Sequence, residues 1–285
     1  MKILLGIIVI FLLYILIEIY WETHHFVVTR YEVKSQKLPK EMKAKKIVFL
    51  SDFHNQNYGE KSIRLVEAIR KEHPDLILIG GDMLVGNSKV PYKNAVDFVK
   101  QLPKIAPVYY ANGNHEQRMH EDAQIYGNLY WDYKKELEKA GVVFLVNEDI
   151  IYGEEKIQIE GLELPKKCYE KFKKPTLEVA EIEERIGKVK DGFTILMAHH
   201  PEHVKTYWQW GADLVLSGHL HGGVVRLPLV GAAISPQYQI FPRYSGDYYK
   251  EGNQGIIVSK GLGMHTIKIR LWNKAEMVVF TLQGE

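Results

Sequence analysis

From residue 46 onward, short apolar runs of strand length alternate with segments in which apolar residues recur every three or four positions. The apolar runs predict strands at residues 47–50, 76–79, 108–110, 193–197, 214–216, 256–259 and 277–282, with shorter candidates at 142–146 and 157–160. The helical periodicity predicts helices at residues 62–72, 92–102 and 131–140, and a further helix within the Lys- and Glu-rich surface stretch 165–190. This alternation is typical of an α/β domain.

The first residues follow a different pattern. Residues 3–17 are apolar with only Gly6 and Tyr14 as soft interruptions, and Tyr20 and Trp21 suit a lipid headgroup region. We expect a transmembrane helix that is retained as an anchor, because no small-x-small cleavage site follows it. A cleaved signal peptide and a buried core helix are the alternatives. The chain therefore divides into an N-terminal membrane anchor at 1–22, a juxtamembrane linker at 23–45 and one domain at 46–285.

The flanking charges leave the orientation in the cell membrane open. Lys2 stands on one side of the apolar segment, whereas Arg30, Lys34, Lys37 and Lys40 follow it. Taken alone, this asymmetry favours a cytoplasmic domain. Long domains often cross a membrane regardless of such charges, so the face on which the domain lies is undecided.

Composition narrows the range of partners. The 285 residues carry a net charge of +2, and no basic block is interleaved with aromatic residues, so nucleic-acid binding is not expected. The single cysteine, Cys168, excludes an internal disulfide framework. Nothing in the sequence indicates an obligate protein partner.

Polar side chains follow five of the predicted strands, each at the point where the apolar run stops. The residues in question are Asp52, His54, Asp82, Asn114, His115, His199, His219 and His221. Because the carboxyl ends of strands in an open α/β sheet meet at one edge, we expect these side chains to converge. Carboxylate and neutral imidazole suit divalent Zn, Mn or Fe, and a shared carboxylate lets two cations lie about 3.5–4 Å apart. The pattern predicts a dinuclear metal site.

The order Asp-x-His, Gly-Asp, Gly-Asn-His-Glu, His, Gly-His-x-His resembles the calcineurin-like metallophosphoesterase superfamily, over residues 46–282. The segment "GHLHGGVVRLPLVG" and the later "VSKGLG" are similar to a bacterial subgroup of membrane- or cell-wall-associated phosphoesterases, related to enzymes that cleave UDP-2,3-diacylglucosamine. The resemblance implies a four-layer α-β-β-α sandwich of two packed mixed sheets with flanking helices.

The resemblance also implies a role for each site residue. Asp52, His54, Asp82 and His221 would hold the first metal, with Asp82 bridging to a second metal held by Asn114, His199 and His219. His115 would lie near the leaving-group oxygen as the catalytic residue. Many relatives carry an aspartate three residues after the Gly-Asp acid, where this chain has Val85.

These residues predict hydrolysis of a phosphodiester or pyrophosphate by a hydroxide that bridges the two metals, with His115 as imidazolium donating a proton to the leaving group. Glu116 either orients His115 or has a structural role in its loop. The anchor and the subgroup favour a small-molecule or lipid-linked phosphoester of the cell envelope as substrate. Two alternatives stay open, namely a membrane-tethered general nucleotide or phosphodiester hydrolase and a non-catalytic metal-binding scaffold.

Overall fold

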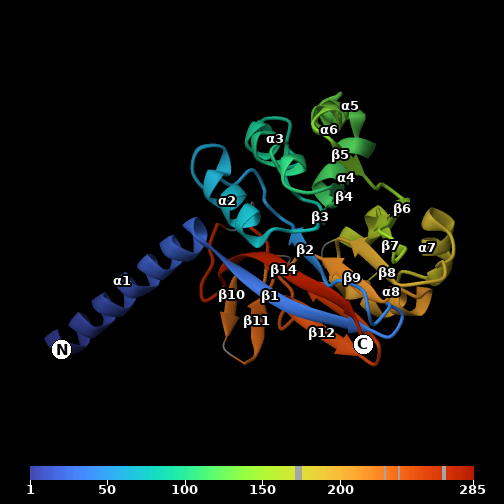
Figure 1. Cartoon of the computed structure of the whole chain (residues 1–285). Coiled ribbons are helices and arrows are strands. Elements are labelled where there is room, and N and C mark those ends of the chain that lie inside the picture. Colours follow the sequence, from blue (N-terminus) through green and yellow to red (C-terminus); the bar gives the residue numbers. More distant parts are fainter. Residues whose placement is uncertain (171–174, 228, 237, 265–267) are drawn as a thin grey trace.

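The computed structural model describes the chain except residues 171–174, 228, 237 and 265–267. Over the described residues, two six-stranded mixed sheets form the centre of the domain (Figure 1). The first sheet has the strand order β1 (Phe26–Ser35), β14 (Ala275–Gly284), β2 (Lys45–Leu50), β3 (Leu76–Ile79), β4 (Val108–Tyr110) and β5 (Val142–Phe144). The second has the order β12 (Asp247–Glu251), β13 (Gln254–Val258), β9 (Leu214–Ser217), β8 (Thr194–Ala198), β7 (Ile157–Leu162) and β6 (Glu148–Tyr152).

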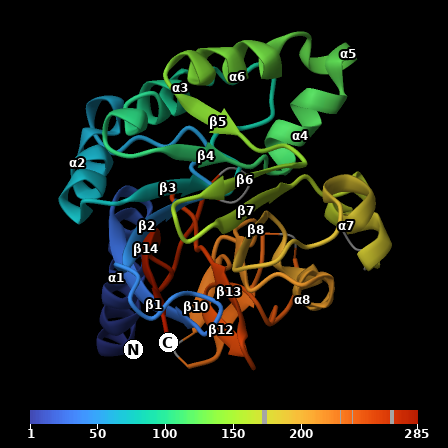
Figure 2. The same ribbon diagram turned by 45° about the vertical axis from the view of Figure 1, so that its right-hand side comes forward.

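Helices cover the outer face of each sheet (Figure 2). The first sheet is covered by α2 (Ile63–Glu72), α3 (Lys93–Val99) and α6 (Leu129–Lys139), and the second by α7 (Val179–Ile186) and α8 (Val204–Trp210). Two further helices, α4 (Asn114–Glu121) and α5 (Ala123–Tyr126), follow β4. A separate antiparallel hairpin consists of β10 (Val225–Leu227) and β11 (Gly231–Ile234).

The side chains of β2 show why the domain has four layers. Ile47 and Phe49 belong to the apolar core between the two sheets, whereas Val48 and Leu50 belong to the core beneath the helices of the first sheet. Both faces of the strand are buried, which is why it reads as an uninterrupted apolar run. Full burial of each such side chain contributes about 1.5–3 kcal/mol. The predicted sandwich of two mixed sheets with flanking helices is confirmed.

The N-terminal part of the domain differs from the prediction. Residues 23–45 are predicted to be a linker, but residues Phe26–Ser35 form β1, which pairs in parallel with β14 along its whole length. β1 is an edge strand with several exposed positions, so its pattern holds charged residues such as Arg30. An edge strand tolerates charged residues on its unpaired side. β1 therefore contains no uninterrupted apolar run from which it could be predicted.

Helix α1 (Lys2–His24) projects away from the domain and leaves its apolar surface uncovered (Figure 1). It is long and apolar enough to cross a membrane, with a mean hydropathy of 2.8 in its most apolar window and none of that window buried. Its C-terminal end is attached to the domain. The side chain of Glu22 accepts a hydrogen bond from the Asn273 backbone N–H at 2.8 Å, and Gln56 donates to the Thr23 carbonyl at 2.7 Å.

Candidate metal centre

The carboxyl ends of β2, β3, β8 and β9 and the start of α4 meet at one edge of the sandwich. Among the described residues, three overlapping groups of buried His and Asp side chains lie there, each with ligand atoms within 4.8 Å of one another. They are Asp52 with His54 and His221, His54 with Asp82 and His115, and Asp82 with His199 and His219. The side chains that follow the predicted strands therefore lie close together in the structure, as the sequence predicts.

The first group is built around Asp52. Its Oδ1 lies 3.4 Å from His221 Nε2 and 3.8 Å from His54 Nε2, and the two imidazole nitrogens are 3.2 Å apart. Separations of this size leave the donor atoms pointing at a common space. The group offers one carboxylate and two imidazoles to a cation.

The second group is built around Asp82. Its Oδ2 lies 3.1 Å from His199 Nε2 and 3.9 Å from the Nε2 atoms of His54 and His115. The Oδ1 atom of Asn114 is buried and has no hydrogen-bond partner among the described residues. A buried amide oxygen without a donor carries a desolvation cost that a cation would relieve. The carboxylate, imidazole and amide atoms present therefore fit divalent cations.

Backbone carbonyls fix the orientation of two imidazoles. His199 Nδ1 donates to the Gly80 carbonyl at 2.7 Å, and His221 Nδ1 donates to the Gly263 carbonyl at 3.0 Å. A carbonyl can only accept, so each ring carries a hydrogen on Nδ1 and turns Nε2 toward the carboxylates, with a free lone pair on Nε2 when the ring is neutral. This is the tautomer that a metal-binding histidine requires.

The backbone is strained where it presents the ligands. Five of the seven predicted metal ligands have a left-handed φ between 48° and 70°, namely Asp52, His54, Asp82, His219 and His221. Each such non-glycine residue costs about 1–3 kcal/mol, and residues of this kind cluster at functional sites. A Cβ atom on Gly218 would lie 2.1 Å from Asp52 Oδ2, so only glycine fits there.

The charges of the site favour ionised carboxylates. Burial alone would raise the pKa of Asp52, but the neighbouring His221 and His199 lower it below its usual range. Burial likewise opposes a charge on His199, whereas Asp82 and Asp52 raise its pKa to about 10. Burial and the adjacent His200 hold the pKa of His219 well below its ordinary value, so His219 is a neutral imidazole.

Glu116 holds the loops that present the ligands. Its fully buried carboxylate accepts backbone N–H groups of Asp82 at 2.8 Å, Met83 at 2.9 Å and Gly113 at 3.0 Å, and the Tyr110 hydroxyl at 2.7 Å. Of the two roles left open by the sequence, the structure shows the second, a loop-supporting role. Burial and the nearby Asp82 raise the pKa of Glu116 to about 7.

Arg270 was not singled out by the sequence analysis. This buried guanidinium donates through Nη2 to the carbonyls of Lys260 at 2.8 Å, Gly263 at 3.0 Å and Gly261 at 3.2 Å. Gly263 also accepts His221 Nδ1, so Arg270 supports the orientation of a predicted ligand. An isolated arginine outside any apolar run gives no signal for such a role.

His115 lies at the edge of the metal centre and contacts the Gly-Asp loop. The backbone N–H of Gly86 donates to His115 Nδ1 at 2.7 Å, next to Val85. Because Nδ1 accepts this bond, the hydrogen of the neutral ring is on Nε2, the nitrogen that faces Asp82.

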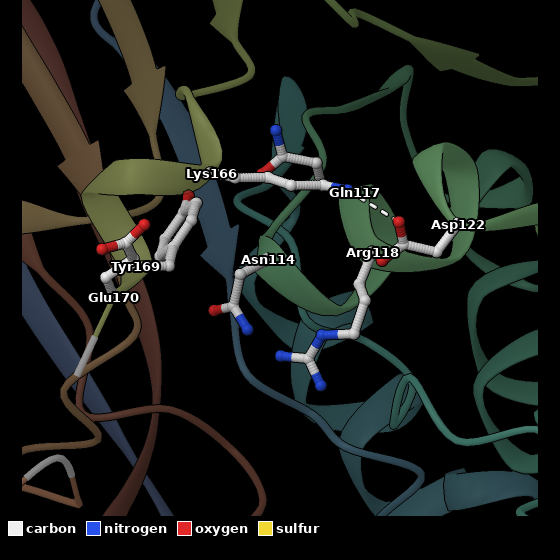
Figure 3. A pocket seen from close by; sticks show the side chains of 7 residues that line it. All are labelled: Asn114, Gln117, Arg118, Asp122, Lys166, Tyr169 and Glu170. Carbon is white, nitrogen blue, oxygen red and sulfur yellow. Dashed lines mark hydrogen bonds and ion pairs between the residues drawn. The ribbon is translucent and has the colours of Figure 1, made fainter. Parts of the chain in front are cut away.

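A cavity of 220 Å³ opens beside Asn114 (Figure 3). Asn114 and Arg118, one turn apart on α4, both line it, and Tyr169 forms the opposite wall. Lys166 is paired with Asp122 at 2.8 Å, whereas Arg118 has no ion pair among the described residues. An anion that enters the cavity next to Asn114 therefore meets the guanidinium of Arg118, while Glu170 lines the cavity beside Tyr169.

The sequence model of the family described as "Calcineurin-like phosphoesterase" matches residues 45–223. This segment contains every predicted metal ligand. The chain belongs to this family. As a calcineurin-like phosphoesterase it is a metal-binding hydrolase that acts on phosphoester bonds.

Several relatives of this calcineurin-like phosphoesterase match over most of the chain. The uncharacterized metallophosphoesterase YkuE of Bacillus subtilis is 28% identical over 93% of this chain and 88% of its own length. The phosphodiesterase YaeI of Escherichia coli is 27% identical over 76% of this chain and 75% of its own length. A transmembrane protein with a metallophosphoesterase domain from Bos taurus is 28% identical over 90% of this chain and 57% of its own length.

Proposed function

We propose that this chain is a membrane-anchored phosphodiesterase that uses two divalent cations, Mn, Zn or Fe. The observation that carries the proposal is the position of Asp82, whose Oδ2 faces His199 at 3.1 Å and His54 at 3.9 Å, one from each ligand group. A carboxylate placed in this way serves two cations at once. The relative YaeI is named a phosphodiesterase, which supports this reaction class.

Each cation has its own set of ligands in this proposal. Asp52, His54, His221 and Asp82 would hold the first, and Asn114, His199, His219 and Asp82 would hold the second. When bound, such a pair shields the negative charge of the phosphate and lowers the pKa of water from 15.7 to about 7. The protein keeps the ligands in place through the Gly80 and Gly263 carbonyls and the Glu116 carboxylate.

His115 would act on the leaving group. Its Nε2–H points into the space shared with Asp82, while Nδ1 is held by Gly86. The sequence analysis expects an imidazolium, whose second hydrogen would face the Gly86 N–H. We therefore assign His115 as a neutral ring whose Nε2–H donates to the departing oxygen. A hydrogen bond from one such preorganised donor to a developing negative charge typically contributes about 10²–10³ in rate.

The substrate would be a phosphodiester or pyrophosphate, either a small molecule or one linked to a lipid of the cell envelope. Arg118 beside Asn114 supports an anionic substrate that extends beyond the metals. Helix α1 supports a membrane location, and one relative is named a transmembrane protein. A general nucleotide hydrolase tethered to the membrane shares these features and differs in gaining no activity from acyl chains on the substrate.

The proposal is tested with the full chain in detergent, stripped of metal and loaded with Mn, Zn or Fe in turn. Turnover of bis(p-nitrophenyl) phosphate is compared with that of the monoester. We expect metal-dependent turnover that falls at least about 100-fold in Asp82→Asn and in His115→Ala. The matched control is His73→Ala, since His73 is an exposed histidine at the C-terminal end of α2. Two bound ions per chain without turnover of either substrate would favour the non-catalytic scaffold.

A further inference from the structure

A group of exposed apolar side chains lies around the β10–β11 hairpin. Leu229 and Val230 lie between the two strands and are 108% and 62% exposed, and Ile240, Phe241 and Trp272 are 73%, 57% and 38% exposed. Leu229, Val230 and Trp272 line one cavity of 460 Å³ together with Arg226 and Arg243. We call these five apolar residues the hairpin face. Contiguous exposed apolar side chains of this kind mark a docking surface.

The hairpin face lies beside helix α1. The indole Nε1 of Trp272 donates to the Tyr14 hydroxyl at 3.4 Å. Tyr14 lies ten residues before the end of the helix at His24, which is about 15 Å along the helix axis. If residues 3–17 occupy the hydrocarbon of a bilayer, Tyr14 lies three residues, about 4.5 Å, inside its edge, so Trp272 reaches into the membrane boundary. Figure 1 shows the hairpin on the same side of the domain as the projecting α1.

The charges around the hairpin face complement an anionic lipid surface. Arg243, which lines the cavity, and Lys274, two residues after Trp272, are exposed and take part in no ion pair among the residues that the structure describes. The nearby Asp247 is already paired with Lys260 at 2.9 Å and with Arg226. Lysine and arginine near a membrane surface are attracted by anionic lipids, at about 1 kcal/mol each.

The same segment is tied to the metal centre. Val225, the first residue of β10, follows the predicted ligand His221 by four residues, so the two lie within about 14 Å of each other. The Asn273 side chain, next to Trp272, donates to the His221 carbonyl at 2.7 Å. A bilayer that contacts the hairpin face thus lies close to the metal ligands.

We propose that the hairpin face docks on the lipid bilayer beside α1, so that the metal centre is held at the membrane surface and acts on phosphoesters that reside in the membrane. This inference rests on the proposed phosphoesterase function for its second part. Its occupant is a bilayer that contains anionic lipid, because α1 is continuous with the face, and because Arg243 and Lys274 beside the face take part in no ion pair among the described residues.

The docking is tested on the full chain in vesicles of phosphatidylcholine and phosphatidylglycerol. A cysteine is introduced at Leu229 or Phe241 and labelled with an environment-sensitive fluorophore. Ile125 on α5, 66% exposed and far from the hairpin, gives the control position (Figure 1). The native Cys168 is buried, which raises its pKa to about 11, so it stays largely unlabelled. We expect blue-shifted emission that is quenched by acyl-chain spin-labelled lipid at 229 and 241 but not at 125.

Two results would overturn the inference. Emission at 229 and 241 that matches the aqueous control would show that the face lies in water. Blue-shifted emission that spin-labelled lipid leaves unquenched, and that grows with the number of chains per vesicle, would show that a second copy of the chain covers it.

Activity separates this inference from the proposed function. Ethyl p-nitrophenyl phosphate is the soluble substrate, and hexadecyl p-nitrophenyl phosphate in vesicles is the membrane substrate. In the double variant Leu229→Asp/Phe241→Asp we expect unchanged turnover of the soluble substrate and about a tenfold or larger loss of kcat/KM on the vesicle substrate. If the double variant and the native chain hydrolyse each substrate equally well, the docking is contradicted but the proposed function is not. Failure of the native chain to hydrolyse either substrate contradicts the proposed function, whatever the fluorescence shows.

Discussion

Replacement of Arg270 by methionine tests whether the buried guanidinium supports the metal-binding loops. Methionine keeps the approximate length of the side chain but removes three hydrogen bonds of 2.8–3.2 Å to backbone carbonyls. Hydrogen bonds from a charged donor contribute about 1.5 kcal/mol each at the low end, which gives about 4.5 kcal/mol for the three. Methionine also avoids the desolvation of a buried cation, which returns part of that loss. We expect the free energy of unfolding to fall by about 2–4 kcal/mol.

The same substitution should weaken metal binding, because Gly263 both accepts from Arg270 and orients His221. Loss of a hydrogen bond that helps to orient a metal ligand typically weakens the affinity for the metal about 10–100-fold. Urea unfolding of the metal-free chain, followed by tryptophan fluorescence, measures the first effect, and calorimetric titration with Mn measures the second. Arg70→Met is the matched control, since Arg70 is an exposed arginine on α2. A stability loss below about 1 kcal/mol, together with unchanged Mn affinity, would refute the role assigned to Arg270.

Three further substitutions have defined outcomes. Gly218→Ala should weaken Mn binding at least about tenfold in calorimetry, because its Cβ would lie 2.1 Å from Asp52 Oδ2 and displace that carboxylate; native affinity would contradict the packing. Burial and Asp149 raise the pKa of Glu160 from 4.5 to about 7. Ionisation of Glu160 as the pH rises through this range therefore opposes folding, by up to about 3 kcal/mol. Glu160→Gln should be more stable than the native chain at pH 8 but not at pH 5 in urea unfolding, and parallel pH profiles would rule this out. Arg118→Gln should raise KM for a soluble phosphodiester about 3–10-fold with little change in kcat, and a loss confined to kcat would contradict a binding role.

The location of the metal centre could be predicted because its signal is local. Each apolar run ends at a polar residue, as at Asp52 after β2 and Asp82 after β3, and the geometry of parallel strands brings those ends together. The sequence could not specify the side chains that support the ligands. Arg270 acts through carbonyl oxygens, which every residue possesses, so its partners leave no trace in the pattern of side chains.

The pairing of β1 with β14 was also beyond the sequence analysis. Phe26 lies opposite Ala275 in the sheet, and the contact depends on the return of the chain's last strand to its first. Periodicity along one segment carries no information about such a distant partner. Asn114, the single predicted ligand from a helix start, could be predicted because only three residues separate it from the end of β4.

One residue, His25, separates the end of α1 from the start of β1, which leaves no slack between the helix and the sheet. A chain built in this way and embedded in a bilayer would move as one rigid body, with its metal centre at a constant height and tilt. Its encounters with a membrane-resident substrate would then be a search in two dimensions, set by lateral diffusion in the plane of the lipid. Lengthening this junction with a flexible insert would turn that planar search into a three-dimensional one around the tether.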